Sequence, residues 1–172
     1  MNWKEKVGRI LTITGAVVFI YVLFLSAYWE KDIRWLHFFQ SWMYIALIVL
    51  VLRGNRWGYF IGLGAALLWD YTNLFVTTFL RAGLAQLHVF AQTGHLSRPD
   101  QFVSVPGWLG NFAIIVGVLV AYAGFPRKQA TDLVRFTVAF VRTTAFFALD
   151  MYLSQPRYLP LFPAMLHPHL HL

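Results

Sequence analysis

The stretch that decides the fold is ILTITGAVVFIYVLFLSAYW, residues 10–29, a run of 20 residues without a charge. An α-helix rises about 1.5 Å per residue, so such a run spans the roughly 30 Å hydrocarbon layer of a membrane. Basic residues precede it, as in a secretory signal, but Phe24 and Leu25 stand where a cleavage site needs small side chains. We therefore predict an uncleaved first membrane span.

Three further charge-poor stretches extend this pattern, and the four predicted spans cover about residues 10–29, 35–52, 57–80 and 106–125. Asp70 is the only charged residue inside them. A short helical segment is also expected in the loop 81–100, because apolar residues recur there at helical spacing and Gly94 follows them. The sequence predicts a single all-α domain, an integral membrane four-helix bundle.

The composition agrees with a membrane location. Hydrophobic residues make up 59% of the 172 residues and charged residues 12%, whereas globular chains have roughly 45 to 50% and about 25%. The chain has no cysteine, which excludes disulfides, thiolate zinc sites and cysteine-held clusters. The net charge of +7 indicates orientation against anionic lipid, and no nucleic acid partner is expected.

The distribution of basic residues predicts the orientation, because cytoplasmic segments of membrane proteins carry an excess of Lys and Arg. With four spans and the N-terminus inside, ten of the 14 basic residues fall on the cytoplasmic side: Lys4, Lys6, Arg9, Arg53, Arg56, Arg127, Lys128, Arg135, Arg142 and Arg157. Both termini are thus predicted inside, in a bacterial inner (cytoplasmic) membrane.

Residues 131–153 are amphipathic, with a narrow polar stripe and charges that interrupt every long apolar run. We expect an interfacial helix on the cytoplasmic face, with a fifth span as the alternative. Four basic residues are predicted to contact lipid headgroups: Arg127, Lys128, Arg135 and Arg142. Residues 154–172 contain four prolines and are expected to be an irregular tail. Alternating histidines near its end are interpreted as solvated, and no metal site is expected.

Polar residues inside the predicted spans are the main functional signal. Asp70 is costly in hydrocarbon unless it is neutral, solvated or paired. Counting about 1.5 Å per residue from the outer boundary, the polar side chains of spans 35–52 and 57–80 lie at matching depths. This match predicts a binding or coupling pocket in the outer half of the bundle. Its predicted members are Asp70, Asn73, Tyr44, Gln40, Ser41, His37 and Thr77. The alternative is that Gln40, Ser41 and Thr77, together with Asn111 of the fourth span, form interhelical hydrogen bonds without a ligand.

Three functions compete on this evidence. The first is a noncatalytic membrane subunit that acts through helix packing in a homo-oligomer or a larger complex, with Gly58 and Gly62 as a close-contact face. The second is a small proton- or cation-coupled carrier or channel that uses Asp70. The third is a lipid- or quinone-handling membrane enzyme. No enzymatic sequence motif and no cofactor signature supports catalysis, so no catalytic residue and no cofactor is predicted.

Overall fold

The computed structural model describes residues 2–169, which form helices joined by short connections and contain no strand. The long helices have these bounds: α1 Trp3–Trp29, α2 Arg34–Leu52, α3 Arg56–Phe75, α4 Phe79–Thr93, α6 Ser104–Gly124 and α7 Thr131–Ser154. Short helical turns lie between and after them: η1 Lys31–Ile33, α5 Pro99–Phe102, η2 Pro156–Tyr158 and α8 Leu161–Ala164.

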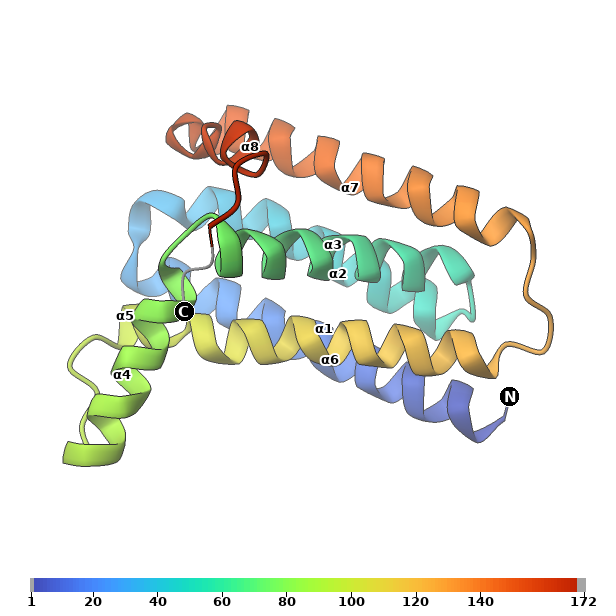
Figure 1. Ribbon diagram of the computed structural model, residues 1–172, viewed down its shortest axis with the longest axis horizontal. Coiled ribbons are helices and arrows are strands. Elements are labelled where there is room, and N and C mark those ends of the chain that lie inside the picture. Colours follow the sequence, from blue (N-terminus) through green and yellow to red (C-terminus); the bar gives the residue numbers. More distant parts are fainter. Residues whose placement is uncertain (1, 170–172) are drawn as a thin grey trace.

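Five helices lie side by side along the long axis of the molecule: α1, α2, α3, α6 and α7 (Figure 1). We call one end of this bundle the cavity end; it carries residues 30–33, 76–103 and 155–169. The other end, here the N-terminal end, carries residue 2 and the connections 53–55 and 125–130. The main chain N–H of His169 donates to the carbonyl of Phe75, so the described chain begins and finishes at opposite ends.

The α1–α6 contact is the closest in the bundle and depends on glycine. Gly8 and Gly15 of α1 face Gly110 and Gly117 of α6, and the glycines of each helix are seven residues apart. A Cβ atom on Gly8 would lie 2.4 Å from the main chain nitrogen of Ala121, and one on Gly15 would lie 2.4 Å from the Gly110 carbonyl. Small residues allow two membrane helices to approach until their backbones touch, which increases their van der Waals contact.

The α3 helix has packing partners on three sides, α2, α6 and α7. Its glycines face these neighbours: Gly58 abuts Leu50 and Val51 of α2, and Gly62 lies against Ile114 of α6. The expectation that Gly58 and Gly62 form a contact face is met within the chain itself. Contacts between copies would therefore need another surface.

The predicted span 57–80 is wrong at its end, because α3 stops at Phe75 and α4 continues at an angle of 73° to it. At the break the hydroxyl of Thr77 accepts from the N–H of Phe79. This N–H begins α4 and has no carbonyl partner within the helix, so a side-chain oxygen serves as its acceptor instead. The predicted loop helix is present as α4, and Gly94 ends it with φ 69°, a left-handed conformation that suits glycine.

The α7 helix turns three polar residues toward the bundle and presents a mostly apolar surface, interrupted by Arg142, on its outward side. Asp132, Thr143 and Asp150 are buried, while large apolar side chains are exposed on the other faces: Leu133, Val134, Val141, Leu149, Tyr152 and Leu153. The helix lies along α3 at mid-length, because a Cβ on Gly64 would be 3.3 Å from the Cα of Phe140. This position along the bundle favours the fifth-span alternative for residues 131–153 over the interfacial helix.

Four helices are long and apolar enough to cross a membrane: α1, α2 with η1, α6 with α5, and α7. The α3 helix meets the criterion only together with the bent α4. Polar residues and glycines reduce the hydropathy of α3, and its central position explains why this is tolerated, since α3 meets protein on three sides. The lengths and apolarity of these helices agree with the predicted membrane character, but the helices that meet the criterion differ from the four predicted spans.

Candidate functional site

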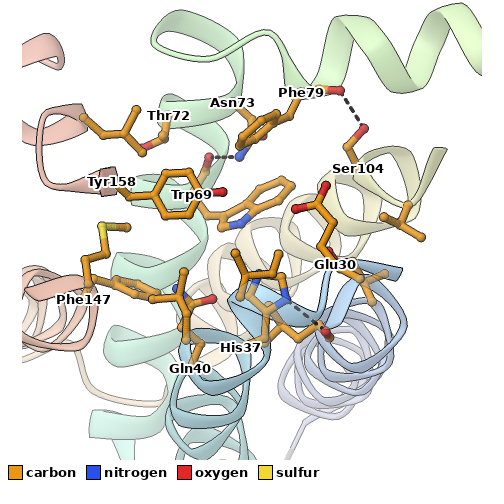
Figure 2. Close-up of a pocket in the computed structure, with 18 of the residues that line it drawn as sticks. Glu30, His37, Gln40, Trp69, Thr72, Asn73, Phe79, Ser104, Phe147 and Tyr158 are labelled. Atoms are coloured by element: carbon orange, nitrogen blue, oxygen red, sulfur yellow. Dashed lines mark hydrogen bonds between the residues drawn. The ribbon is translucent and has the colours of Figure 1, made fainter. Parts of the chain in front are cut away.

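A cavity of about 360 Å³ opens among the helices at the cavity end. Apolar side chains line it from α1, from α7 and from the C-terminal segment, and Figure 2 shows Phe147 and Tyr158 on the side of α7 and the C-terminal segment. Phe19 and Trp69 form its base and touch edge to face, with ring centroids 5.0 Å apart. The volume falls in the range of sites that hold small organic molecules.

Polar groups enter the cavity from α2 and α3. His37 and Gln40 are one helical turn apart on α2, and Thr72 and Asn73 face them from α3 (Figure 2). The His37 Nδ1 lies 3.0 Å from the Leu23 carbonyl and donates to it, which leaves Nε2 as an acceptor. The Gln40 side chain is 5% exposed and has no hydrogen-bond partner among residues 2–169. Gln40 can therefore donate to and accept from a bound molecule.

The mouth of the cavity carries charged residues. Glu30, Arg98 and Asp100 line it, and the Arg98 guanidinium forms two hydrogen bonds with the Asp100 carboxylate, at 3.0 and 2.7 Å. Partial burial, together with the negative charges of Asp32 and Asp100, raises the pKa of the Glu30 carboxyl above its ordinary value of 4.5. An apolar interior below a charged mouth matches a molecule with an apolar body and a polar head.

The C-terminal segment covers one side of the cavity. Tyr158, Phe162 and Met165 line it, and the Tyr71 hydroxyl donates to the Met165 carbonyl at 2.8 Å. An ion pair between Arg157 and Asp32 joins the segment to the connection between α1 and α2. The expected irregular tail is therefore partly helical, and it belongs to the cavity end.

A second cluster of polar side chains lies between α2, α3 and α6, further from the cavity mouth than His37 and Gln40. Tyr44 is completely buried, and its hydroxyl donates to the Asn111 side-chain carbonyl at 3.3 Å. Asp70 is 6% exposed, and its Oδ1 has no hydrogen-bond partner among the described residues. The Asn111 amide nitrogen is buried without a partner as well. Buried polar atoms without partners are costly, so this group is a second place where function could reside.

The seven predicted pocket residues are not all brought together. His37, Gln40 and Asn73 line the cavity, while Asp70 and Tyr44 lie outside its lining. The expected hydroxyl and amide partners of Asp70 are engaged elsewhere, since Asn73 donates to the Trp69 carbonyl and Tyr44 donates to Asn111.

The two remaining predicted residues bond locally. The Ser41 hydroxyl donates to the Phe38 carbonyl of its own helix, and the Thr77 hydroxyl lies 3.5 Å from the Asn73 side-chain oxygen. Neither lines the cavity.

The four predicted headgroup residues occupy different environments. Arg135 binds the buried carboxylate of Asp132, which also binds Arg56 at 2.9 Å. Lys128 lies over the Tyr122 ring, and the Arg127 main chain carbonyl accepts from Arg56. These groups gather at the N-terminal end. Arg142 does not, because it lies halfway along α7.

Sequence reasoning missed the wall formed by α7 and the C-terminal segment. Phe147 and Met151 of α7 and the aromatic and sulfur-containing residues of the segment 156–165 were not linked to α2. The one available signal was the clustering of Tyr158, Phe162 and Met165 in a region otherwise marked by prolines. Comparisons with protein family models, with curated proteins and with solved structures gave no match to this chain.

Proposed function

We propose that this chain is a noncatalytic, multi-pass membrane subunit that binds an amphipathic small molecule, of the lipid or quinone type, at the cavity end. The observation that carries the proposal is the cavity itself, which combines apolar side chains from α1 and α7 with the polar side chains of His37 and Gln40 from α2. Ligand sites are usually concave and apolar with a few convergent polar groups. A carbonyl or hydroxyl of the ligand head would meet Gln40 and His37.

The proposed topology has five spans with the N-terminus inside and the cavity end outside. The α3 helix crosses inside the bundle, and α4 leaves it at the outer surface. On the inner side this arrangement places eight basic residues, Lys4, Lys6, Arg9, Arg53, Arg56, Arg127, Lys128 and Arg135. On the outer side it places five, Lys31, Arg34, Arg81, Arg98 and Arg157. The excess inside agrees with the positive-inside rule, and the proposal replaces the expected cytoplasmic tail by an outer one.

Labelling of single cysteines tests the topology cleanly, because the chain has no cysteine of its own. We expect a membrane-impermeant maleimide to label Leu166→Cys in intact cells or sealed spheroplasts. Lys128→Cys should be labelled only after the membrane is opened. Equal protection of both positions would contradict the five-span arrangement.

Ligand binding is tested with the full chain purified in a mild detergent. Native mass spectrometry and solvent extraction should find a co-purified amphiphile, and a short-chain quinone or a fluorescent phospholipid should then compete for its place. Gln40→Leu should weaken binding of the probe about tenfold, the loss expected when one or two buried hydrogen bonds to a ligand are removed.

The matched control is Gln92→Leu, which makes the same change on the exposed face of α4. Its affinity should equal that of the unchanged protein. A cavity that carries no amphiphile and binds neither probe would overturn the proposed function. Equal effects of the two substitutions would overturn the assignment of Gln40.

A second candidate function, proton- or cation-coupled transport, is favoured by one observation. The Asp70 carboxyl is buried in α3, five residues before the end of the helix, with an oxygen that has no partner among residues 2–169. A buried carboxyl of this kind can bind and release a proton or cation. Asp70→Asn should then abolish pH-dependent uptake into proteoliposomes without loss of folded protein, and unchanged uptake would exclude the coupling role.

A further inference from the structure

The α7 helix carries a charge on its outward side that the rest of the chain does not neutralise. Arg142 is exposed, and within residues 2–169 it has neither an ion pair nor a side-chain hydrogen bond. By contrast, Arg135, two turns earlier, is bound to Asp132. The two arginines lie seven residues apart and so share one side of the helix.

Arg142 lies at the middle of the helix. It follows Thr131 by 11 residues and precedes Ser154 by 12, which at about 1.5 Å per residue places it about 17 and 18 Å from the two ends. Long basic side chains reach the headgroup layer only from near the ends of a span. A guanidinium at this depth therefore needs a neighbour with complementary charge, if α7 spans as proposed above.

The chain itself cannot supply that neighbour through a second copy in its present packing. Asp70 and Asp150, the carboxylates in the C-terminal halves of α3 and α7, are 6% and 5% exposed. Asp150 faces the bundle and accepts from Ser154 at 3.0 Å, and Asp70 lies among α2, α3 and α6. A second copy would have to unpack its bundle to offer either one to Arg142.

The surroundings of Arg142 suit a helical partner. Ala145 and Leu149 follow it at i+3 and i+7 on the same side, and both are exposed. The small side chain of Ala145 lets another helix approach closely. Within the described chain the main packing partners of α7 are α2, α3 and the turn η2, and Phe162 of α8 lies at the edge of the same surface.

We infer that the Arg142 side of α7 binds a transmembrane helix of a different protein that carries an aspartate or glutamate near the middle of the membrane. The pairing removes an uncompensated charge from lipid on both sides, so it favours the heteromeric complex over either separate chain. This inference rests on the five-span topology of the proposed function but not on the ligand in the cavity.

The experiment uses photo-cross-linking of the full chain in its own host's membranes. A photoreactive amino acid replaces Ala145, and in a control it replaces Leu119, an exposed residue of α6. We expect a protein adduct from position 145 whose partner has a carboxylate inside a predicted span. Arg142→Leu should reduce that adduct at least tenfold, and so should replacement of the partner's carboxylate by its amide.

A charge exchange completes the test, since Arg142→Glu combined with arginine at the partner's acidic position should restore the adduct. An adduct between two copies of this chain would overturn the inference, and so would cross-links to lipid alone or an adduct insensitive to Arg142→Leu. Folding is checked by thermal unfolding in detergent, where Arg142→Leu should be no less stable than the parent chain. Ligand binding in the cavity should be unchanged, and this result separates failure of the inference from failure of the proposed function.

Discussion

The α1–α6 contact and the α3–α7 contact join helices of similar length in different ways. The first places glycine against backbone, with Gly117 next to Thr12 and Gly8. The second buries polar residues of α7, including Asp132 and Thr143, and leaves the cavity beside its outer half. The comparison teaches that the α1–α6 pair is tightly packed through glycines, while α7 packs less closely and leaves space for a cavity, which α1 also lines.

The largest effect is expected from breaking the rigid contact with Gly117→Ala. The new Cβ would lie 2.6 Å from both the main chain nitrogen and the hydroxyl of Thr12, and backbone cannot move aside as a flexible side chain can. We expect a loss of about 3 kcal/mol or more in the free energy of unfolding, or no folded protein. Thermal unfolding in detergent measures it. Ala123→Val, on the exposed side of the same helix, is the control and should change little.

The next effect concerns the ionic cluster that fastens α7 to α3. Asp132 is 2% exposed and binds both Arg56 and Arg135, so Asp132→Asn leaves two guanidinium groups without a carboxylate. We expect a loss of about 3 kcal/mol, as for other buried ion pairs that lose one partner. Arg135→Gln should cost under about 1 kcal/mol, because that residue is more exposed and Arg56 remains paired. Equal losses for the two variants would show that the burial of Asp132 does not determine how much the ionic cluster contributes to stability.

A smaller effect is expected for Gly64→Ala in the α3–α7 contact. The added Cβ would lie 3.3 Å from the Phe140 Cα, which requires a shift of a few tenths of an ångström rather than a collision. The change in unfolding free energy should stay within about 1 kcal/mol. A loss as large as that of Gly117→Ala would mean that the two contacts are equally tight, and would contradict the difference proposed between them.

The smallest effect is a pH dependence at the cavity mouth. The pKa of Glu30 is raised in the folded chain, so the folded state holds this proton more tightly than the unfolded state does. The protonated Glu30 carboxyl therefore contributes its full stabilisation of the folded state below about pH 4. This contribution is lost as the pH rises through the raised pKa. Glu30→Gln should not alter the melting temperature at pH 4 but should raise it by about 1 °C at pH 8. Equal shifts at both pH values would rule out titration of Glu30.

The sequence predicted the membrane class because distances between charges measure spans directly, as residues 10–29 and 35–52 show. The interfacial position expected for residues 131–153 assumed that the polar side of the helix faces headgroups and water, whereas Asp132 and Asp150 turn toward other helices. The break after Phe75 could not be predicted from a proline or glycine, since the residues at the bend are Val76, Thr77 and Thr78.

The candidate site was half predicted for a related reason. Helical spacing placed His37 and Gln40 on one face of α2, and this holds in the structure. The partners of Asp70 depend on how α3 is rotated against α2 and α6, which the spacing within one helix does not determine. The part of the apolar wall that comes from α7 and the C-terminal segment lies more than 100 positions after Gln40, as for Phe147 and Phe162.

The bonds from Tyr71 to the Met165 carbonyl and from His169 to the Phe75 carbonyl have a practical consequence for anyone who purifies this chain. An affinity tag attached on the C-terminal side of His169 would therefore start from the cavity end, the same end as the opening through which the proposed guest molecule would enter. Preparations tagged in front of Asn2 leave that opening clear, and the two kinds of preparation should differ in how much guest they retain.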